Sequence, residues 1–360
     1  MASRSGQTSI GEREVAAAFA RIEEELLASM VRNLKRHRAE EAEMGIEWAQ
    51  WQALQIESLA AYARENVRVQ GRRFDRLNAQ VRRIVAKSYR GAALAQEREI
   101  LEAVAKGWRG GQRPTGSFFE VPRERLDALL MATQSDLMRA EHAVLRRAND
   151  QYRSIIFDAQ VYAVSGAGTY EKAVDMAAHD FLAKGVDGIV YRNGSRHTIA
   201  EYAAMVVRTT SKRAALVAEG EMRSEWGVHT VVVDRRDDAC PECMEWVGEV
   251  LVDDVYAEGT AEEADALGVH LLSEAVDAGL FHPNCRDTTS TWFPGVSKMP
   301  KRPGRAAQAR AEEREEAEQR GNSARAAEAR YGRLAEFSLD PANQERYAAK
   351  EAEWAKRARA

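Results

Sequence analysis

The sequence predicts a predominantly helical α+β protein, and three observations support this prediction. Apolar residues recur at intervals of three and four over much of residues 1–164, which is typical of amphipathic helices. Residues 165–299 contain short β-branched segments separated by turns, which indicates a small α+β domain. Residues 300–360 alternate Glu, Arg and Ala, which is typical of a charged helix or a partly disordered tail. We therefore expect three consecutive segments with these boundaries.

Composition excludes several classes of protein. The 360 residues suffice for two domains, and a net charge of -4, from 52 basic and 56 acidic residues, gives no overall bias toward nucleic acid or membrane. No apolar run approaches the roughly 18–20 residues that a membrane span needs, and the N-terminal residues lack the apolar core of a secretory signal. Three cysteines, an odd number, argue against a disulfide scaffold and indicate a reducing compartment.

Three apolar patterns in the first 90 residues predict helices. The first predicts a helix of roughly 25 residues, and the others follow it closely. Such stripes usually pack within their own chain, and the alternative is packing on a partner protein. The three patterns consist of Val15, Phe19, Ile22, Leu26, Met30 and Leu34; of Trp48, Trp51, Leu54, Leu59 and Tyr62; and of Leu77, Val81, Ile84 and Val85.

A basic segment covers residues 68–90 and contains a single acidic residue, Asp75. On a helix, Arg72, Arg76 and Arg83 fall near one face, which could contact the phosphates of nucleic acid. The alternatives are a solvated surface and a face matched to an acidic partner protein. The basic residues of this segment are Arg68, Arg72, Arg73, Arg76, Arg82, Arg83, Lys87 and Arg90.

Further elements follow a loop at residues 107–116. A helix is expected over 122–162, a turn at 165–169, and a short hairpin around Asn193-Gly194, because this pair suits a two-residue turn. Thr198 can cap a helix over 199–225. Strands are expected at 228–233, 247–252 and 288–293, with a helix over 260–278.

The three cysteines and one histidine form two short pairs in the central segment. Cys240 and Cys243 make a C-x-x-C pair, and His282 and Cys285 make an H-x-x-C pair. Two intervening residues allow a tight turn to direct both side chains at one ion, and two such turns complete a tetrahedron. Thiolates with one imidazole favour Zn²⁺. We therefore predict these four residues as the ligands of a structural zinc, the alternative being reduced thiols beside a structural histidine.

Two nearby aspartates and two enzyme classes bear on the interpretation of these four residues as a structural zinc site. Asp238 or Asp287 is expected either to replace one ligand or to orient His282 from outside the metal shell. A zinc deaminase needs an upstream H-x-E, and none of the upstream histidines has Glu two positions on. An HNH-like nuclease would use His282 as a base, which a zinc ligand cannot do at the same time.

Several motifs resemble one protein family. These are YRNG at 191–194, YAAMVVRTT at 202–210, DACPEC at 238–243 and GLFHPNCR at 279–286, followed by Pro294-Gly295. Together they are similar to tailed-phage minor capsid proteins of the Mu F-like head-morphogenesis family. The resemblance covers roughly residues 185–295. The family commonly has a histidine where this chain has Asp287.

The resemblance implies a structural protein of the phage head rather than an enzyme. Such a protein would associate with the portal protein and the major capsid protein during procapsid assembly and during packaging or retention of double-stranded DNA. It would be found in the virion, and in the host cytoplasm during assembly, without membrane contact. The N-terminal helices would suit docking on a helical partner such as the portal. The alternative is a DNA-binding or nucleolytic head protein that uses the basic 68–90 segment and the knuckle.

Overall fold

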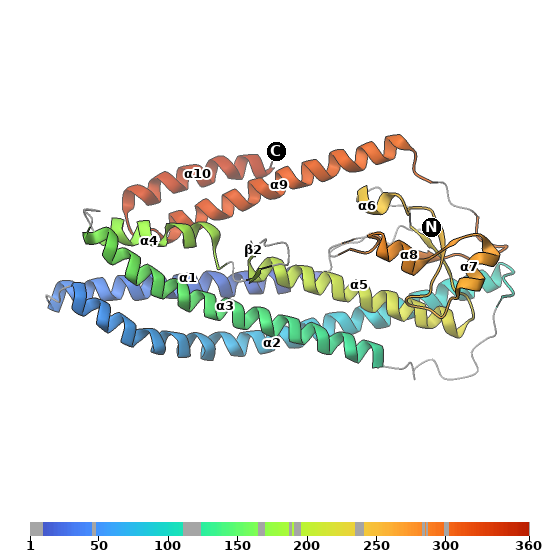
Figure 1. Ribbon diagram of the computed structural model, residues 1–360, viewed down its shortest axis with the longest axis horizontal. Helices are drawn as coiled ribbons and strands as arrows, with labels where there is room; N and C mark the ends of the chain where they lie inside the picture. Colours follow the sequence, from blue (N-terminus) through green and yellow to red (C-terminus); the bar gives the residue numbers. More distant parts are fainter. Residues whose placement is uncertain are drawn as a thin grey trace. The chain divides into compact units, whose positions relative to one another are not determined.

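The structure is a computed structural model that describes residues 10–44, 48–110, 124–164, 170–186, 189–190, 196–234, 241–282, 285, 287–298 and 302–359. Long helices make up most of this chain, and a small sheet lies between them in sequence, which confirms the predicted fold class (Figure 1). The helices are α1 (Ile10–Met44), α2 (Trp48–Ala105), α3 (Glu124–Val164), α4 (Tyr170–Lys184), α5 (Ile199–Glu225), α6 (Pro241–Met244), α7 (Ala261–Leu267), α8 (Leu272–Asp277), α9 (Arg305–Phe337) and α10 (Pro341–Arg359). The strands are β1 (Ile189–Val190), β2 (Arg196–His197), β3 (Thr230–Val233), β4 (Val250–Val252), β5 (His270–Leu271) and β6 (Thr289–Thr291).

The chain forms two compact units, each assembled from separate stretches. Unit 1 comprises residues 1–12, 80–134 and 205–317, and unit 2 comprises residues 13–79, 135–204 and 318–360. The division into three consecutive segments stays a prediction. Across the described residues, no helix combines the length with the apolar character needed to cross a membrane.

Unit 1 contains a four-stranded sheet in the order β5-β4-β3-β6. The central strand β3 pairs antiparallel with both β4 and β6, while β4 and β5 are parallel. Val231 of β3 lies opposite Leu251 and Thr291 in this register, and the β-branched residues of β3 and β4 fill the core. The short helices α6, α7 and α8 lie near the sheet (Figure 1), and α8 contributes the buried Leu272 and Ala275.

A buried polar network joins the helices of unit 1 to this sheet. Arg223 of α5 forms an ion pair with Asp253, and both side chains are at most 1% exposed. Arg223 also donates to Gln96 of α2, whose amide donates to Thr291 of β6 over 2.7 Å. Asp253 in turn accepts from the backbone N–H groups of residues 255 and 256. Because buried charges need partners, each member of this network depends on the others.

Unit 2 is built from helices whose apolar stripes face one another. The stripe of α1 predicted from the sequence, from Val15 to Leu34, is buried throughout. Phe19 contacts Phe74 of α2 with the ring centroids 5.8 Å apart, and Tyr62 contacts Tyr152 of α3 at 4.7 Å. These contacts favour the intramolecular interpretation of the stripe over docking on a partner. At the C-terminal end of the unit, α10 folds back along α9 (Figure 1).

Polar contacts at helix ends complete unit 2. Arg333 of α9 donates to the carbonyl oxygens of Leu182 and Ala183, each over 3.0 Å, and so satisfies the C-terminal end of α4. The carboxylate of Glu23, buried on α1, accepts from the N–H of Val186 over 3.0 Å. Gly185 between them has φ +76°, a left-handed conformation that glycine adopts without strain.

Two predicted boundaries were wrong. The second and third apolar patterns belong to one helix, α2, because buried Asn66 and Gln70 interrupt the apolar pattern without interrupting the helix. The expected helix over 260–278 is two helices separated by β5, since Gly268 ends α7 in a left-handed conformation. The predicted hairpin is present as β1 paired with β2, and its predicted turn at Asn193-Gly194 lies outside the described residues.

Hydrogen bonds test the one helix cap predicted at Thr198. Thr198 accepts from the N–H of Glu201 over 3.2 Å, and the Glu201 carboxylate accepts from the N–H of Thr198 over 2.9 Å, so the expected cap of α5 is confirmed. Thr260 and Glu263 form the same reciprocal arrangement at the start of α7. The N-terminal ends of both helices are therefore specified locally by the sequence.

Candidate metal centre

Three of the four predicted zinc ligands lie together in unit 1. One ligand atom from each of Cys243, His282 and Cys285 lies within 4.8 Å of the others. Cys243 comes from α6, and the other two come from the segment between α8 and β6. The fourth predicted ligand, Cys240, and the predicted neighbour Asp238 lie outside the described residues.

A tight turn brings His282 and Cys285 to one side of the cluster. The N–H of Cys285 donates to the carbonyl oxygen of His282 over 2.9 Å, which closes the turn. Phe281, just before it, has φ +63°, an uncommon backbone conformation for a bulky residue. The N–H of Asp287 then donates to the Sγ atom of Cys285 over 3.4 Å. The backbone hydrogen bond to His282 and the N–H···S contact from Asp287 fix the direction of the Cys285 thiol.

The donor set fits a soft divalent ion such as zinc. The Sγ atoms of Cys243 and Cys285 are 3.5 Å apart, and both side chains are buried. A disulfide would need about 2.05 Å, whereas two thiolates at about 2.3 Å from a tetrahedral zinc would be separated by roughly 3.8 Å. The observed separation is close to the second value. Two sulfur atoms and one imidazole can therefore hold a metal ion here.

The electrostatics of the cluster favour the thiolate form of Cys285. Its pKa is lowered to about 6, chiefly because the Cys243 thiol hydrogen-bonds to it. Burial opposes this shift, while the charge of Lys212 and the N–H of Asp287 add to it. Because the thiolate is the form that binds metal, this environment prepares Cys285 for coordination.

Asp287 lies beside the cluster rather than in the group of three. It is 1% exposed, and one of its carboxylate oxygens is 3.6 Å from the Sγ atom of Cys285. This position suits a residue that adjusts the charge around a metal and orients its ligands. Its role stays a prediction, as do those of Cys240 and Asp238.

Lys212 of α5 also reaches this site and was missed by sequence reasoning. Its Nζ atom donates to the carbonyl oxygen of Cys285 over 3.4 Å and lies 4.1 Å from the centroid of the Phe281 ring. Burial lowers the pKa of Lys212, and the charges of Cys285, Asp287 and Cys243 oppose that shift. Nothing in the sequence distinguishes Lys212 from its neighbour Arg213, because the pairing with Cys285 spans 73 residues.

The predicted basic segment lies on α2 and is mostly exposed. Arg73 is half-buried and forms an ion pair with Glu25, whereas the other seven cations are exposed. Arg68 pairs with Glu65, and Arg82 donates to Gln134. Arg72, Arg76, Arg83, Lys87 and Arg90 complete the exposed set.

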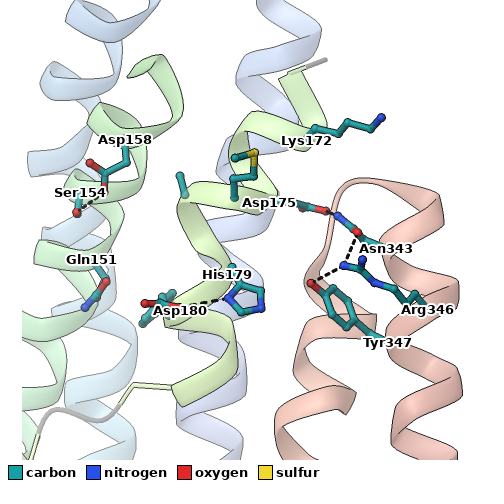
Figure 2. A pocket seen from close by; sticks show the side chains of 13 residues that line it. Gln151, Ser154, Asp158, Lys172, Asp175, His179, Asp180, Asn343, Arg346 and Tyr347 are labelled. Atoms are coloured by element: carbon teal, nitrogen blue, oxygen red, sulfur yellow. Dashed lines mark hydrogen bonds and ion pairs between the residues drawn. The ribbon is translucent and has the colours of Figure 1, made fainter. Parts of the chain in front are cut away.

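A pocket of about 740 Å³ lies in unit 2 among α3, α4 and α10. Figure 2 shows Asp175 of α4 directed at Asn343 of α10, near Arg346 and Tyr347. Asp175 accepts from the Ser338 hydroxyl, from the N–H groups of residues 339 and 340, and from the Asn343 amide. The lining carries both signs of charge, and its buried carboxylate is used to hold the α9–α10 turn. We therefore interpret this pocket as a structural junction between helices.

Comparison with known proteins identifies the class to which this chain belongs. The family profile described as phage minor capsid protein 2 matches residues 6–334. The chain belongs to this family and is thus a structural capsid protein of a phage, which confirms the minor capsid resemblance drawn from the motifs. Searches among curated proteins and among solved structures find no significant match.

Proposed function

We propose that this protein is a minor component of the phage head that associates with the portal during procapsid assembly and DNA packaging or retention. The observation that carries this proposal is the family match over residues 6–334. The major capsid protein and packaged double-stranded DNA are its expected neighbours in the virion. Its assembly would take place in the host cytoplasm, and its role would be structural rather than catalytic.

The docking surface that fits a helical partner lies on the second half of α2. Leu94 and Leu101 are 51% and 42% exposed there, although both are large apolar side chains. A separation of seven residues puts them on one face of the helix. The stripe of α1 is unsuitable, because Val15 to Leu34 is already buried within unit 2. An apolar pair on an exposed helix suits packing in a groove of a helical partner.

A pull-down with the portal protein of the same phage tests this docking. At moderate salt the wild-type chain should be retained, and the Leu94→Glu/Leu101→Glu variant should not be. Val67→Glu is the matched control, because Val67 is 54% exposed on the same helix and should tolerate the charge. A wild-type chain that does not associate with the portal, or a double variant that binds as well as the control, would refute the assignment.

We further propose that zinc occupies the cysteine cluster in a structural role. Cys240, Cys243, His282 and Cys285 would hold the ion, which would join α6 to the segment before β6. Four protein ligands leave no open position for a reacting water, and this is the arrangement of structural rather than catalytic zinc. Metal analysis of protein purified without chelator should find about one zinc per chain. Protein that is folded but free of zinc would end this proposal.

The exposed cations of α2 support contact with DNA as a second candidate function. A face that neutralises phosphates binds DNA with a strong dependence on salt. Arg72→Glu/Arg76→Glu should weaken binding to double-stranded DNA and flatten its salt dependence. Arg21→Glu on α1 is the control, because Arg21 is also exposed. Binding that is insensitive to salt, or equal in both variants, would count against DNA contact.

A further inference from the structure

The position of Lys212 relates it to the metal cluster rather than to solvent. Its side chain is partly buried, and its ammonium group contacts the carbonyl oxygen of Cys285 and the face of the Phe281 ring. These two residues flank the ligand His282. Lys212 lies on a different element, α5, and from there contacts the segment that supplies His282 and Cys285, two of the three described candidate ligands.

The charges of the loaded cluster leave an excess of negative charge. With a divalent ion bound, the thiolates of Cys243 and Cys285 and the carboxylate of Asp287 would carry three negative charges against the ion's two positive charges. Cys240, if it also ligates, adds a fourth. Cys243, Cys285 and Asp287 are buried, so water cannot screen this excess effectively. A buried excess charge is stable only when an opposite charge faces it.

Lys212 is placed to supply that opposite charge. Its charge interacts with those of Cys285, Asp287 and Cys243. We propose that Lys212 is the charge-compensating and positioning residue of the metal centre, where its ammonium group balances the thiolates and Asp287 and holds the 281–285 turn through the Cys285 carbonyl. This inference rests on the proposed zinc site and assigns to it a residue outside the ligand set.

The two contributions of Lys212 can be separated by substitution. Lys212→Met keeps the length of the apolar stem and removes both the charge and the donor. Lys212→Gln removes the charge and keeps an N–H donor for the carbonyl of Cys285. Arg213→Met is the matched control, because it removes the same charge from the next, exposed position of α5.

Zinc affinity of the full-length chain, measured by competition with a chromophoric chelator, tests the proposal. Loss of a partner of the metal ligands typically lowers metal affinity about 10–100-fold. We expect Lys212→Met and Lys212→Gln to bind zinc that much more weakly and Arg213→Met to bind like wild type. The absorption spectrum of the Co²⁺-loaded protein should retain its thiolate charge-transfer bands in every variant, because the ligands are unchanged.

The outcomes of these affinity measurements distinguish the role of Lys212 from the presence of the zinc site. Wild-type affinity in both Lys212 variants would overturn the inference while the zinc site stands. Wild-type affinity in Lys212→Gln alone would overturn charge compensation and leave positioning. A wild-type chain that binds neither zinc nor cobalt would refute the zinc site, and the inference with it. Circular dichroism of each variant separates lost affinity from lost folding.

Discussion

In unit 1, the space between helices and sheet contains a thiol cluster and a buried ion pair, whereas the interior of unit 2 is filled by apolar stripes on long helices. The strands of unit 1 are two to four residues long. Such a small sheet buries little apolar surface, so cross-links between distant segments contribute more to its stability. The helices of unit 2 bury long continuous stripes and need polar contacts mainly where helices end. The two units should therefore respond differently to the loss of a polar group.

The largest loss of stability is expected in unit 1 from Cys285→Ser. This change removes a ligand of the proposed zinc, whose binding contributes on the order of 10 kcal/mol in small zinc domains. Unit 1 of the variant should then unfold at a markedly lower temperature. Hydrogen exchange of the backbone amides in β3 and β6, measured at increasing temperature, reports this unfolding. A chelator should destabilise the wild type and leave the variant unchanged. Equal sensitivity of both proteins to the chelator would show that unit 1 does not depend on this cluster.

The next largest effect is expected from Arg223→Met, which leaves Asp253 charged and buried without its ion-pair partner. Removing one partner of a buried pair costs about 3–5 kcal/mol. Urea unfolding should report this loss, and Arg213→Met should change the unfolding free energy by less than about 0.5 kcal/mol. Adding Asp253→Asn to Arg223→Met should recover part of the stability, because it removes the uncompensated charge. No recovery would mean that hydrogen bonding rather than charge dominates the network.

Unit 2 should show its own dependence on pH through Glu23. Burial raises the pKa of Glu23 from 4.5 to about 7, against the N–H of Val186 and the charge of Arg333. The folded state therefore keeps this proton at pH values where the unfolded state has lost it. The contribution of Glu23 to stability is greatest below pH 4.5 and falls as the pH rises to about 7. The shift corresponds to a loss of up to about 3 kcal/mol.

Thermal unfolding at pH 5 and pH 8 measures this contribution. Glu23→Gln keeps an acceptor for Val186 and cannot ionise, so its stability should fall less between the two pH values than that of wild type. Glu24→Gln is the control, because Glu24 is the exposed neighbour on the same helix. The same decrease in Glu23→Gln as in wild type would assign the pH dependence to other groups, such as Glu141, whose pKa is also raised to about 7 by burial.

Local patterns predicted much of this architecture. The stripe of α1 and the capping by Thr198 follow from residues near in sequence, and the spacing of the cysteines indicated a cluster of which three members lie together. Partners far apart in sequence could not be predicted. Lys212 reaches Cys285 across 73 residues, and no local rule specifies such a pairing. The length of α2 was also missed, because its core face includes buried polar residues.

The smallest and most local loss of stability is expected at Asp175. This residue is a buried polar group of unit 2 with several hydrogen-bond partners at one helix junction, so it tests whether unit 2 depends on polar contacts only where helices end. It accepts hydrogen bonds from Ser338, Asn343 and the backbone between them, and so anchors the turn between α9 and α10 to α4 (Figure 2). Asp175→Asn replaces one acceptor oxygen by a donor that faces other donors. We expect a loss of about 2–3 kcal/mol, since hydrogen bonds to a charged group are the stronger kind.

The site of this loss distinguishes a local junction from a general contribution to the core. Hydrogen exchange should accelerate in α10 and the preceding turn, while the apolar stripe of α1 keeps its protection, because the two depend on different contacts. Asp180→Asn is the matched control, since Asp180 lies on the same helix with its side chain 83% exposed. Acceleration throughout unit 2 would instead mean that its helices depend on this polar junction as closely as unit 1 depends on its ion pair.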